Sequence, residues 1–178
     1  DEKIYSSTFF KSSYNLSIKN DNVAIIGGGD GGVARECLDN STNYIDWYEL
    51  DPEIVESCYR YLPKVCSKVK KSNNVNTFWG DAFESIKLVE DSKYDKIFVD
   101  LNDDQYCIDL ARKNMKGLKR ILKPGGVITA QVGSKDKKPK QVENWCKVLE
   151  KSFGNVNISG VHVPSFDCNW NFASSIMK

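Results

Sequence analysis

The chain has 178 residues, enough for one domain that buries a hydrophobic core without disulfides or metals. Hydrophobic residues make up 40% of it and charged residues 28%, and 25 Lys and Arg against 24 Asp and Glu leave a formal net charge of +1. This balance favours neither nucleic acid nor an anionic membrane as a partner, and no apolar run approaches the ~20 residues that span a bilayer. Because no signal peptide opens the chain either, we expect a soluble, cytoplasmic protein.

The six cysteines occur singly, without C-x-x-C pairs, and His162 is the only histidine. Free cysteines on inward helix positions behave as small hydrophobic residues, so we expect them to be reduced. A metal site is not expected, because the residues that usually bind one are too few and too scattered.

Residues 1–20 mix Ser, Tyr, Phe and Lys without clear periodicity and match no motif. Their large side chains are expected to pack on the following domain or against a neighbouring one: Ile4, Tyr5, Phe9, Phe10 and Tyr14. We therefore predict a lead-in segment, residues 1–21, before a single domain of residues 22–178.

A glycine-rich turn follows the first predicted strand, Val23 to Ile26, and precedes a predicted helix from Gly32 to Leu38. Its sequence is Gly27-Gly-Gly-Asp-Gly-Gly32, which matches the loose dinucleotide pattern G-x-G-x-x-G. Glycines allow positive φ and close backbone approach, so a ligand can lie against N–H groups at the helix start. Asp30 would repel a pyrophosphate and suits a cation, which argues against NAD and for an amine or a sulfonium. A purely structural turn is the alternative.

The second predicted strand, Tyr44 to Leu50, delivers Glu49 to its carboxyl end, where a carboxylate can accept both hydroxyls of a ribose. Asp51 and Pro52 then predict an N-cap and first turn for a helix. The remaining pattern predicts helices at 52–62, 82–89, 105–122 and ending near 153, strands at 75–79, 96–100, 127–132, 156–163 and 171–177, and solvated loops at 64–74 and 134–140. This alternation predicts a doubly wound, mostly parallel α/β sheet, whose last strand is antiparallel because no crossover helix fits before it.

Acidic residues stand at four strand ends of this predicted sheet, where α/β proteins bind ligands: Asp30, Glu49, Asp81 and Asp100. Four carboxylates around one crevice repel one another unless the ligand supplies donors or positive charge. Simpler roles are open for two of them, since Asp81 suits a helix N-cap and Glu49 could pair with a surface lysine. Asp100 ends an apolar strand, at a position typical of a catalytic group.

The loop Gly27-Gly-Gly-Asp-Gly-Gly-Val-Ala-Arg-Glu36 resembles the signature of the polyamine aminopropyltransferases, the spermidine and spermine synthase family. The resemblance covers about residues 20 to 178, with further matches in the family's order: Tyr48-Glu-Leu-Asp51, Gly80-Asp-Ala-Phe-Glu84, Tyr94-Asp-Lys-Ile-Phe-Val-Asp100, Leu122-Lys-Pro-Gly-Gly126, Gln131, Val163-Pro-Ser-Phe166, Trp170 and Phe172. It implies a seven-stranded, Rossmann-like fold of the S-adenosylmethionine-dependent transferase type. The implied reaction transfers a propylamine group from decarboxylated S-adenosylmethionine to a diamine or polyamine, leaves methylthioadenosine and uses no metal.

The resemblance also implies roles for individual residues. Asp100 matches the family's base for the attacking amine, and Asp103 matches the aspartate that holds the amine substrate. Leu101, Phe166 and Trp170 would line the substrate channel. The co-substrate would be bound by Gly27, Gly28, Gly29, Asp30, Gly31, Glu49, Asp81, Ala82 and Gln131.

The chain departs from the family pattern in three places. The loop Asp100-Leu-Asn-Asp-Asp104 lacks two serines and a proline, Phe166 replaces a frequent tyrosine, and residues 1–21 stand where members carry a small β-rich domain. That domain supplies much of the oligomer contact in the family. For this chain the resemblance leaves three assemblies open: a homodimer, a homotetramer or a subunit of a related enzyme. Two other functions are open: an S-adenosylmethionine-dependent methyltransferase, and a catalytically impaired, nucleoside-binding or regulatory homologue.

Overall fold

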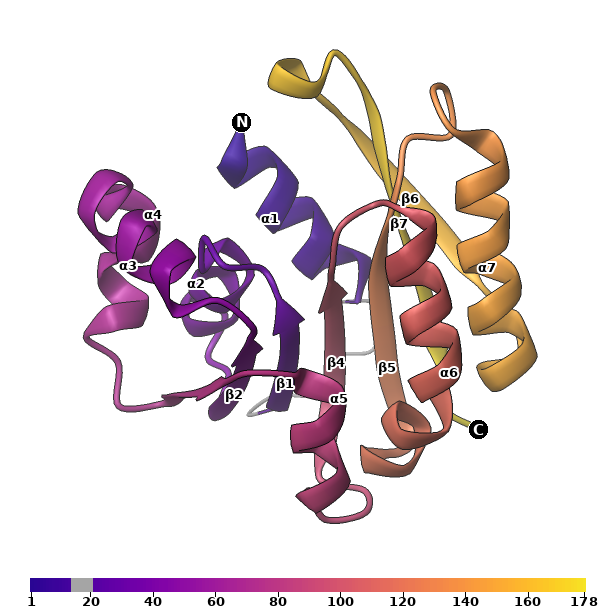
Figure 1. The fold of residues 1–178 in the computed structure, drawn as a ribbon, viewed down its shortest axis with the longest axis horizontal. Coiled ribbons are helices and arrows are strands. Elements are labelled where there is room, and N and C mark those ends of the chain that lie inside the picture. The colour runs from indigo at the N-terminus through magenta and orange to yellow at the C-terminus, as the bar shows by residue number, and fades with distance from the viewer. Residues whose placement is uncertain (14–20) are drawn as a thin grey trace.

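The computed structural model describes residues 1–13 and 21–178, in which seven strands form one sheet with helices on both faces (Figure 1). The strand order is β3-β2-β1-β4-β5-β7-β6, and the strands are parallel except β7, which is antiparallel to both β5 and β6. Their bounds are β1 Asn22–Gly27, β2 Tyr44–Glu49, β3 Val75–Trp79, β4 Tyr94–Asp100, β5 Leu122–Gly133, β6 Asn157–Val163 and β7 Cys168–Ile176. The doubly wound α/β fold with an antiparallel last strand is therefore confirmed.

The strand order reverses between β1 and β4, which makes this pair the topological switch point. Gly27, the last residue of β1, is paired with Asp100, the last residue of β4. In open α/β sheets, ligands bind beyond the carboxyl ends of the strands at such a point. The topology alone thus brings the glycine loop and Asp100 to the same crevice.

Side chains of the buried strand β1 alternate between two hydrophobic clusters. Val23 and Ile25 pack under the helices of one face, and Ala24 and Ile26 under those of the other. The first face carries α1 (Glu2–Ser12), α2 (Gly32–Asp39), α3 (Pro52–Tyr61) and α4 (Pro63–Lys70). The second carries α5 (Ala82–Ser85), the 3-10 turn η1 (Ile86–Leu88), α6 (Gln105–Ile121) and α7 (Pro139–Phe153), with α6 and α7 side by side in Figure 1.

Local signals placed several helices correctly. The Asp51 side chain accepts a hydrogen bond from the Glu53 N–H at 2.8 Å and caps α3, with Pro52 at its first position. The stripe expected on α6 is buried at every predicted position, because apolar residues three and four apart share one helix face: Ile108, Ala111, Met115, Leu118 and Ile121.

One prediction about a polar segment was wrong, and a second segment, for which no helix or strand was predicted, is helical. The loop expected at residues 64–74 contains α4, which begins at Pro63 and buries Cys66 and Val69 one turn apart while its lysines face solvent. The lead-in without periodicity contains α1, whose Phe9 and Phe10 are buried in the core. In both, a few buried side chains outweigh an otherwise polar composition.

Part of the predicted lead-in, residues 14–20 with Tyr14, lies outside the described residues. All six cysteines carry free thiols, and four of them are buried: Cys37, Cys66, Cys107 and Cys168. Within residues 1–13 and 21–178, no helix is both long and apolar enough to cross a bilayer.

Candidate active site

A pocket of about 1200 Å³ opens beyond the carboxyl ends of β1, β2 and β4. It is lined by every residue singled out from the sequence except Gly31: Gly27, Gly28, Gly29, Asp30, Glu49, Asp81, Ala82, Asp100, Leu101, Asp103, Gln131, Phe166 and Trp170. Gly31 instead precedes α2 in the left-handed conformation, with φ 73°, against the ring of Trp47. Five of these residues are acidic and come from distant parts of the sequence, and four further acids also line the pocket: Asp1, Glu2, Asp51 and Asp104.

The glycine loop lies directly against the end of β4. The Gly28 N–H donates to the Asp100 carbonyl at 3.0 Å, and a Cβ on Gly28 would lie 2.9 Å from Asp100 Oδ2. Gly28 also has φ 70°, which favours glycine. This close approach leaves the loop N–H groups and the Asp100 carboxylate in contact with the same pocket.

The Asp30 side chain turns toward the start of α2, where its Oδ1 accepts from the Gly32 N–H at 2.8 Å. Burial raises the pKa of the Asp30 carboxyl, the Gly32 N–H lowers it, and the nearby Glu2 raises it again. The net effect is a raised pKa, as expected for a carboxylate that lacks a cation in direct contact.

Glu49 and Asp81, for which the resemblance implies contacts with the co-substrate, both line the pocket. Glu49 is buried at the end of β2 and accepts from the Asp51 N–H at 3.1 Å through Oε1, while its Oε2 faces Gly29. Asp81 caps α5, since its Oδ1 accepts from the Phe83 N–H at 2.8 Å. The N-cap alternative for Asp81 is therefore correct, although Asp81 and Ala82 also line the pocket. The surface-lysine alternative for Glu49 does not fit its buried position.

Asp100 is the most perturbed acid of the pocket, and its partner is Tyr5 of α1. The Tyr5 hydroxyl donates to Asp100 Oδ1 at 2.6 Å across 95 positions of sequence. Burial raises the pKa of Asp100 to about 7; the Tyr5 hydrogen bond lowers it, and the charges of Asp30 and Glu49 raise it. A carboxyl group that titrates near neutral pH suits a general base.

Sequence reasoning assigned Tyr5 no role at the site. The one available signal was helical spacing, since Tyr5 and the buried Phe9 are four residues apart and share a face of α1. The Tyr5 ring lies edge to face with Phe172 at 5.1 Å and Phe166 at 6.3 Å. Burial, followed by the charge of Asp100, raises the pKa of Tyr5, so its hydroxyl keeps its proton.

Two lysines from the predicted solvated loop at residues 134–140 contact residues that line the pocket. The Lys138 ammonium lies 3.0 Å from Asp103 Oδ2, and the Lys137 ammonium donates to the Phe166 carbonyl at 2.7 Å. Both side chains come from the segment before α7. Asp103, predicted to hold the amine substrate, and Phe166, predicted for the substrate channel, are thus both in contact with the chain's own ammonium groups.

Gln131 is buried on β5 and holds two channel residues together. Its Nε2 donates to the Leu101 carbonyl, and its Oε1 accepts from the Trp170 Nε1–H at 3.1 Å. The Trp170 ring in turn lies 4.7 Å from that of Phe166. These contacts hold two aromatic rings of the pocket lining together.

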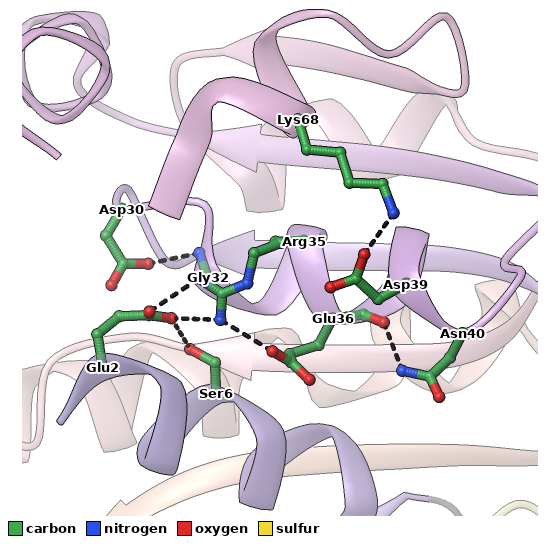
Figure 2. Close-up of polar contacts among 9 residues, drawn as sticks. All are labelled: Glu2, Ser6, Asp30, Gly32, Arg35, Glu36, Asp39, Asn40 and Lys68. Atoms are coloured by element: carbon green, nitrogen blue, oxygen red, sulfur yellow. Dashed lines mark hydrogen bonds and ion pairs between the residues drawn. The ribbon is translucent and has the colours of Figure 1, made fainter. Parts of the chain in front are cut away.

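A buried network of charged groups joins α1 to α2 beside the glycine loop (Figure 2). The Arg35 guanidinium donates to both carboxylate oxygens of Glu2, at 2.8 and 2.9 Å, and to Glu36 at 2.8 Å. Burial lowers the pKa of Arg35, but its contacts with Glu2 and Glu36 outweigh burial and raise it, so the group stays charged. In the part of the chain that the structure describes, no group of three or more His, Cys, Asp or Glu side chains could hold a metal ion.

The fold and pocket define a doubly wound α/β protein with an acidic pocket at its topological switch point. The family model described as "Spermine/spermidine synthase domain" matches residues 2–178. The chain therefore belongs to the spermine/spermidine synthase family.

Curated relatives are named polyamine aminopropyltransferases. One from Prochlorococcus marinus strain NATL1A is 33% identical over 97% of this chain and 62% of its own length. One from Korarchaeum cryptofilum is 26% identical over 97% of this chain and 54% of its own length. The chain thus spans about six tenths or less of these two relatives.

Solved structures of spermidine synthases share the fold at 19% sequence identity. One, in complex with the transition state analogue AdoDATO, has a TM-score of 0.91 over 100% of this chain and 62% of its own. Another, from Thermotoga maritima, has a TM-score of 0.86 over 100% of this chain and 60% of its own.

Proposed function

We propose that the chain carries the catalytic domain of a polyamine aminopropyltransferase, which transfers a propylamine group from decarboxylated S-adenosylmethionine to a diamine or polyamine. The observation that supports this most directly is that nine acidic residues, Asp100 among them, line one pocket. Such a set excludes anionic ligands and attracts cations. Both substrates of the proposed reaction are cations.

The residues present fit the adenosyl co-substrate. Glu49 would accept from the ribose hydroxyls, and Asp81 with Ala82 would bind the adenine. Asp30 would face the propylamine ammonium, and the loop glycines would allow close approach of the ligand to the backbone. Support comes from the pocket lining, from the relatives' names and from the analogue bound to the structurally similar spermidine synthase.

The chemistry needs a base because the attacking amine arrives protonated. With a pKa of about 10.4, an alkylammonium is only about one part in a thousand neutral near pH 7.4, a cost of about 4 kcal/mol. The amine nitrogen attacks the propyl carbon next to sulfur, and the carbon–sulfur bond breaks. Its electron pair neutralises the sulfonium and methylthioadenosine leaves, while Asp100 accepts the amine proton. Asp103 would hold the acceptor amine for this attack.

Tyr5 orients the base in this proposal. Its hydroxyl donates to one oxygen of Asp100 and leaves the other oxygen, which lies toward Gly28, for the amine. The same hydrogen bond opposes the rise in the Asp100 pKa caused by burial, so a larger fraction of the base is ionised at neutral pH.

Calorimetric titration separates this function from its alternatives. The protein is titrated with decarboxylated S-adenosylmethionine, S-adenosylmethionine and methylthioadenosine, and products are then assayed with putrescine and with spermidine. Preference for the decarboxylated compound with amine turnover supports aminopropyl transfer. Preference for S-adenosylmethionine itself indicates a methyltransferase, and binding without turnover indicates a regulatory homologue.

The domain boundary and the assembly are also proposals. We propose that residues 22–178 form the catalytic domain and residues 1–21 lead into it from a position that a small β-rich domain takes in the family, with a homodimer, a homotetramer or a related enzyme as the assembly. Size-exclusion chromatography with light scattering tests the assembly.

A further inference from the structure

The contacts of Arg35 with Glu2 connect α1, α2 and the glycine loop. Arg35 belongs to α2, which begins directly after the glycine loop, and Glu2 belongs to α1, which carries Tyr5. Both carboxylate oxygens of Glu2 accept hydrogen bonds from Arg35, and Oε1 also accepts one from the Ser6 hydroxyl at 2.6 Å. Arg35 is buried and Glu2 largely so, and bidentate pairs of this kind fix the geometry of both partners.

The start of α2 fits against α1 without spare room. A Cβ on Gly32 would lie 2.2 Å from Glu2 Oε1 and 2.3 Å from the Ser6 hydroxyl oxygen. Gly32 does not have a positive φ, so contact with α1 is what excludes a side chain there. The position of α1 is therefore set against the same loop that contacts Asp100.

The two ends of α1 are held differently. Its second half is anchored in the core by Phe9, whose ring stacks on Phe172 at 4.7 Å and meets Phe98 edge to face at 5.4 Å. Its first turn is held by the polar contacts of Glu2 and by the Asp1 carboxylate, which accepts from the Ser165 N–H at 2.7 Å. Tyr5 lies three residues after Glu2, within one helical turn. We therefore expect a change at the ion pair to shift the Tyr5 hydroxyl while the core contacts of Phe9 stay in place.

We propose that Arg35 and Glu2 are positioning residues, whose ion pair places the first turn of α1 on the glycine loop and thereby holds the Tyr5 hydroxyl on Asp100. This rests on the proposed function, in which Asp100 is the base. Neither residue takes a proton or touches the reacting atoms. They act through Tyr5 and determine whether Asp100 keeps its 2.6 Å hydrogen bond.

Three variants test the proposal, and each disturbs the contact differently. Glu2→Gln keeps the shape and removes the charge, Arg35→Met removes the guanidinium at similar length, and Gly32→Ala displaces the Glu2 carboxylate and the Ser6 hydroxyl without changing a charge. Each is expected to lower kcat about fivefold to tenfold with KM for the amine within about twofold, since general base catalysis as a whole contributes about 10²- to 10⁴-fold. Lys68→Met is the matched control, because it removes an exposed ion pair with Asp39 elsewhere in this part of the fold (Figure 2).

Two readouts distinguish positioning from a general loss of stability. First, the acidic limb of the kcat/KM profile should move to higher pH, as in Tyr5→Phe, because losing the Tyr5 hydrogen bond raises the pKa of Asp100. Gly32→Ala changes no charged side chain, whereas Arg35→Met removes a charge that lowers the pKa of Asp30 and Glu2→Gln removes one that raises it. A shift of the Asp100 pKa in the same direction in all three variants therefore does not come from Asp30. Second, in a Tyr5→Phe background the three substitutions should lower kcat no further. Additive losses, or an unmoved acidic limb, would overturn the proposal.

One measurement does not depend on turnover. Carbon-13 NMR titration of the Asp100 carboxyl should show a higher pKa in Glu2→Gln and Arg35→Met than in the unmodified protein and in Lys68→Met. If the unmodified protein transfers no aminopropyl group, the proposed function fails, yet this titration still decides the positioning role. An equal Asp100 pKa in all four proteins refutes it. Should Arg35→Met fail to fold, the nearly isosteric Glu2→Gln carries the same test.

Discussion

The Lys138 ammonium lies 3.0 Å from Oδ2 of Asp103, the carboxylate proposed to hold the amine substrate. The chain therefore places one of its own ammonium groups where the acceptor's ammonium is expected. Both side chains are partly exposed, at 54% and 31%, so the pair is weak and an incoming amine can displace it.

Removing this competitor should improve acceptor binding. In Lys138→Met, KM for putrescine or spermidine is expected to fall about twofold to fivefold with kcat unchanged, because exposed ion pairs contribute about 0.2–1 kcal/mol. Steady-state kinetics at fixed co-substrate measure this. Lys147→Met is the control, since it removes an exposed ion pair of α7 with Glu143. An unchanged KM would show that Lys138 does not compete with the amine.

Tyr5→Phe should lower kcat and change the pH at which the enzyme works. The Tyr5 hydrogen bond lowers the pKa of Asp100, so its loss raises that pKa above about 7 and leaves the base protonated up to a higher pH. The acidic limb of kcat/KM is therefore expected to move toward alkaline pH. The control is Tyr61→Phe, which alters a tyrosine that is 71% exposed. A limb that stays in place would argue against contact between Tyr5 and the base.

Asp100→Asn should separate binding from chemistry. An amide cannot accept the amine proton at neutral pH, so turnover is expected to fall by about 10²- to 10⁴-fold. Calorimetry should show an affinity for decarboxylated S-adenosylmethionine close to that of the unmodified protein, while Asp109→Asn, at an exposed pair with Arg112, should keep full turnover. Undiminished turnover in Asp100→Asn would remove Asp100 from the mechanism.

The raised pKa of Asp100 also predicts how stability depends on pH. Its folded-state value of about 7 exceeds the ordinary value of 3.8, so between these values the folded protein binds a proton that the unfolded chain has lost. The free energy of unfolding therefore falls as pH rises through this window, by at most about 4 kcal/mol. Asp100→Asn removes this loss without removing the hydrogen-bond acceptor for Tyr5.

Thermal unfolding of the unliganded protein tests the stability prediction. The Tm of Asp100→Asn should exceed that of the unmodified protein at pH 8, and the difference should shrink toward pH 4. A difference that is the same at both pH values would mean that burial does not perturb the Asp100 carboxyl.

Much of the fold was predictable because its signals are local. The apolar run before Gly27, the cap formed by Asp51 and the apolar stripe of α6 each determine an element through near neighbours in sequence. The pairing of Gly27 with Asp100 follows from the same information, because parallel strands in this order bring their carboxyl ends together. The acidic side of the pocket could therefore be assembled from the sequence alone.

The errors concerned segments whose structure depends on a few buried side chains. The lysine-rich residues 64–70 form a helix because Cys66 and Val69 are buried where α4 packs against α2 and α3, and local sequence does not indicate that contact. Lys138 likewise belongs to a charge run that suggests a solvated loop. Only the tertiary fold shows that Asp103, 35 positions earlier, faces it.

The sequence by itself determined the seven strands in chain order, the glycine loop and the acids at the strand ends, because each depends on residues close together along the chain. Only the tertiary structure decided which side chain meets Asp100. Tyr5 reaches it because Phe9 packs between β4 and β7 while Arg35 holds Glu2 beside the glycine loop. Those contacts join residues up to 163 positions apart, a relationship that is determined by packing rather than by local sequence.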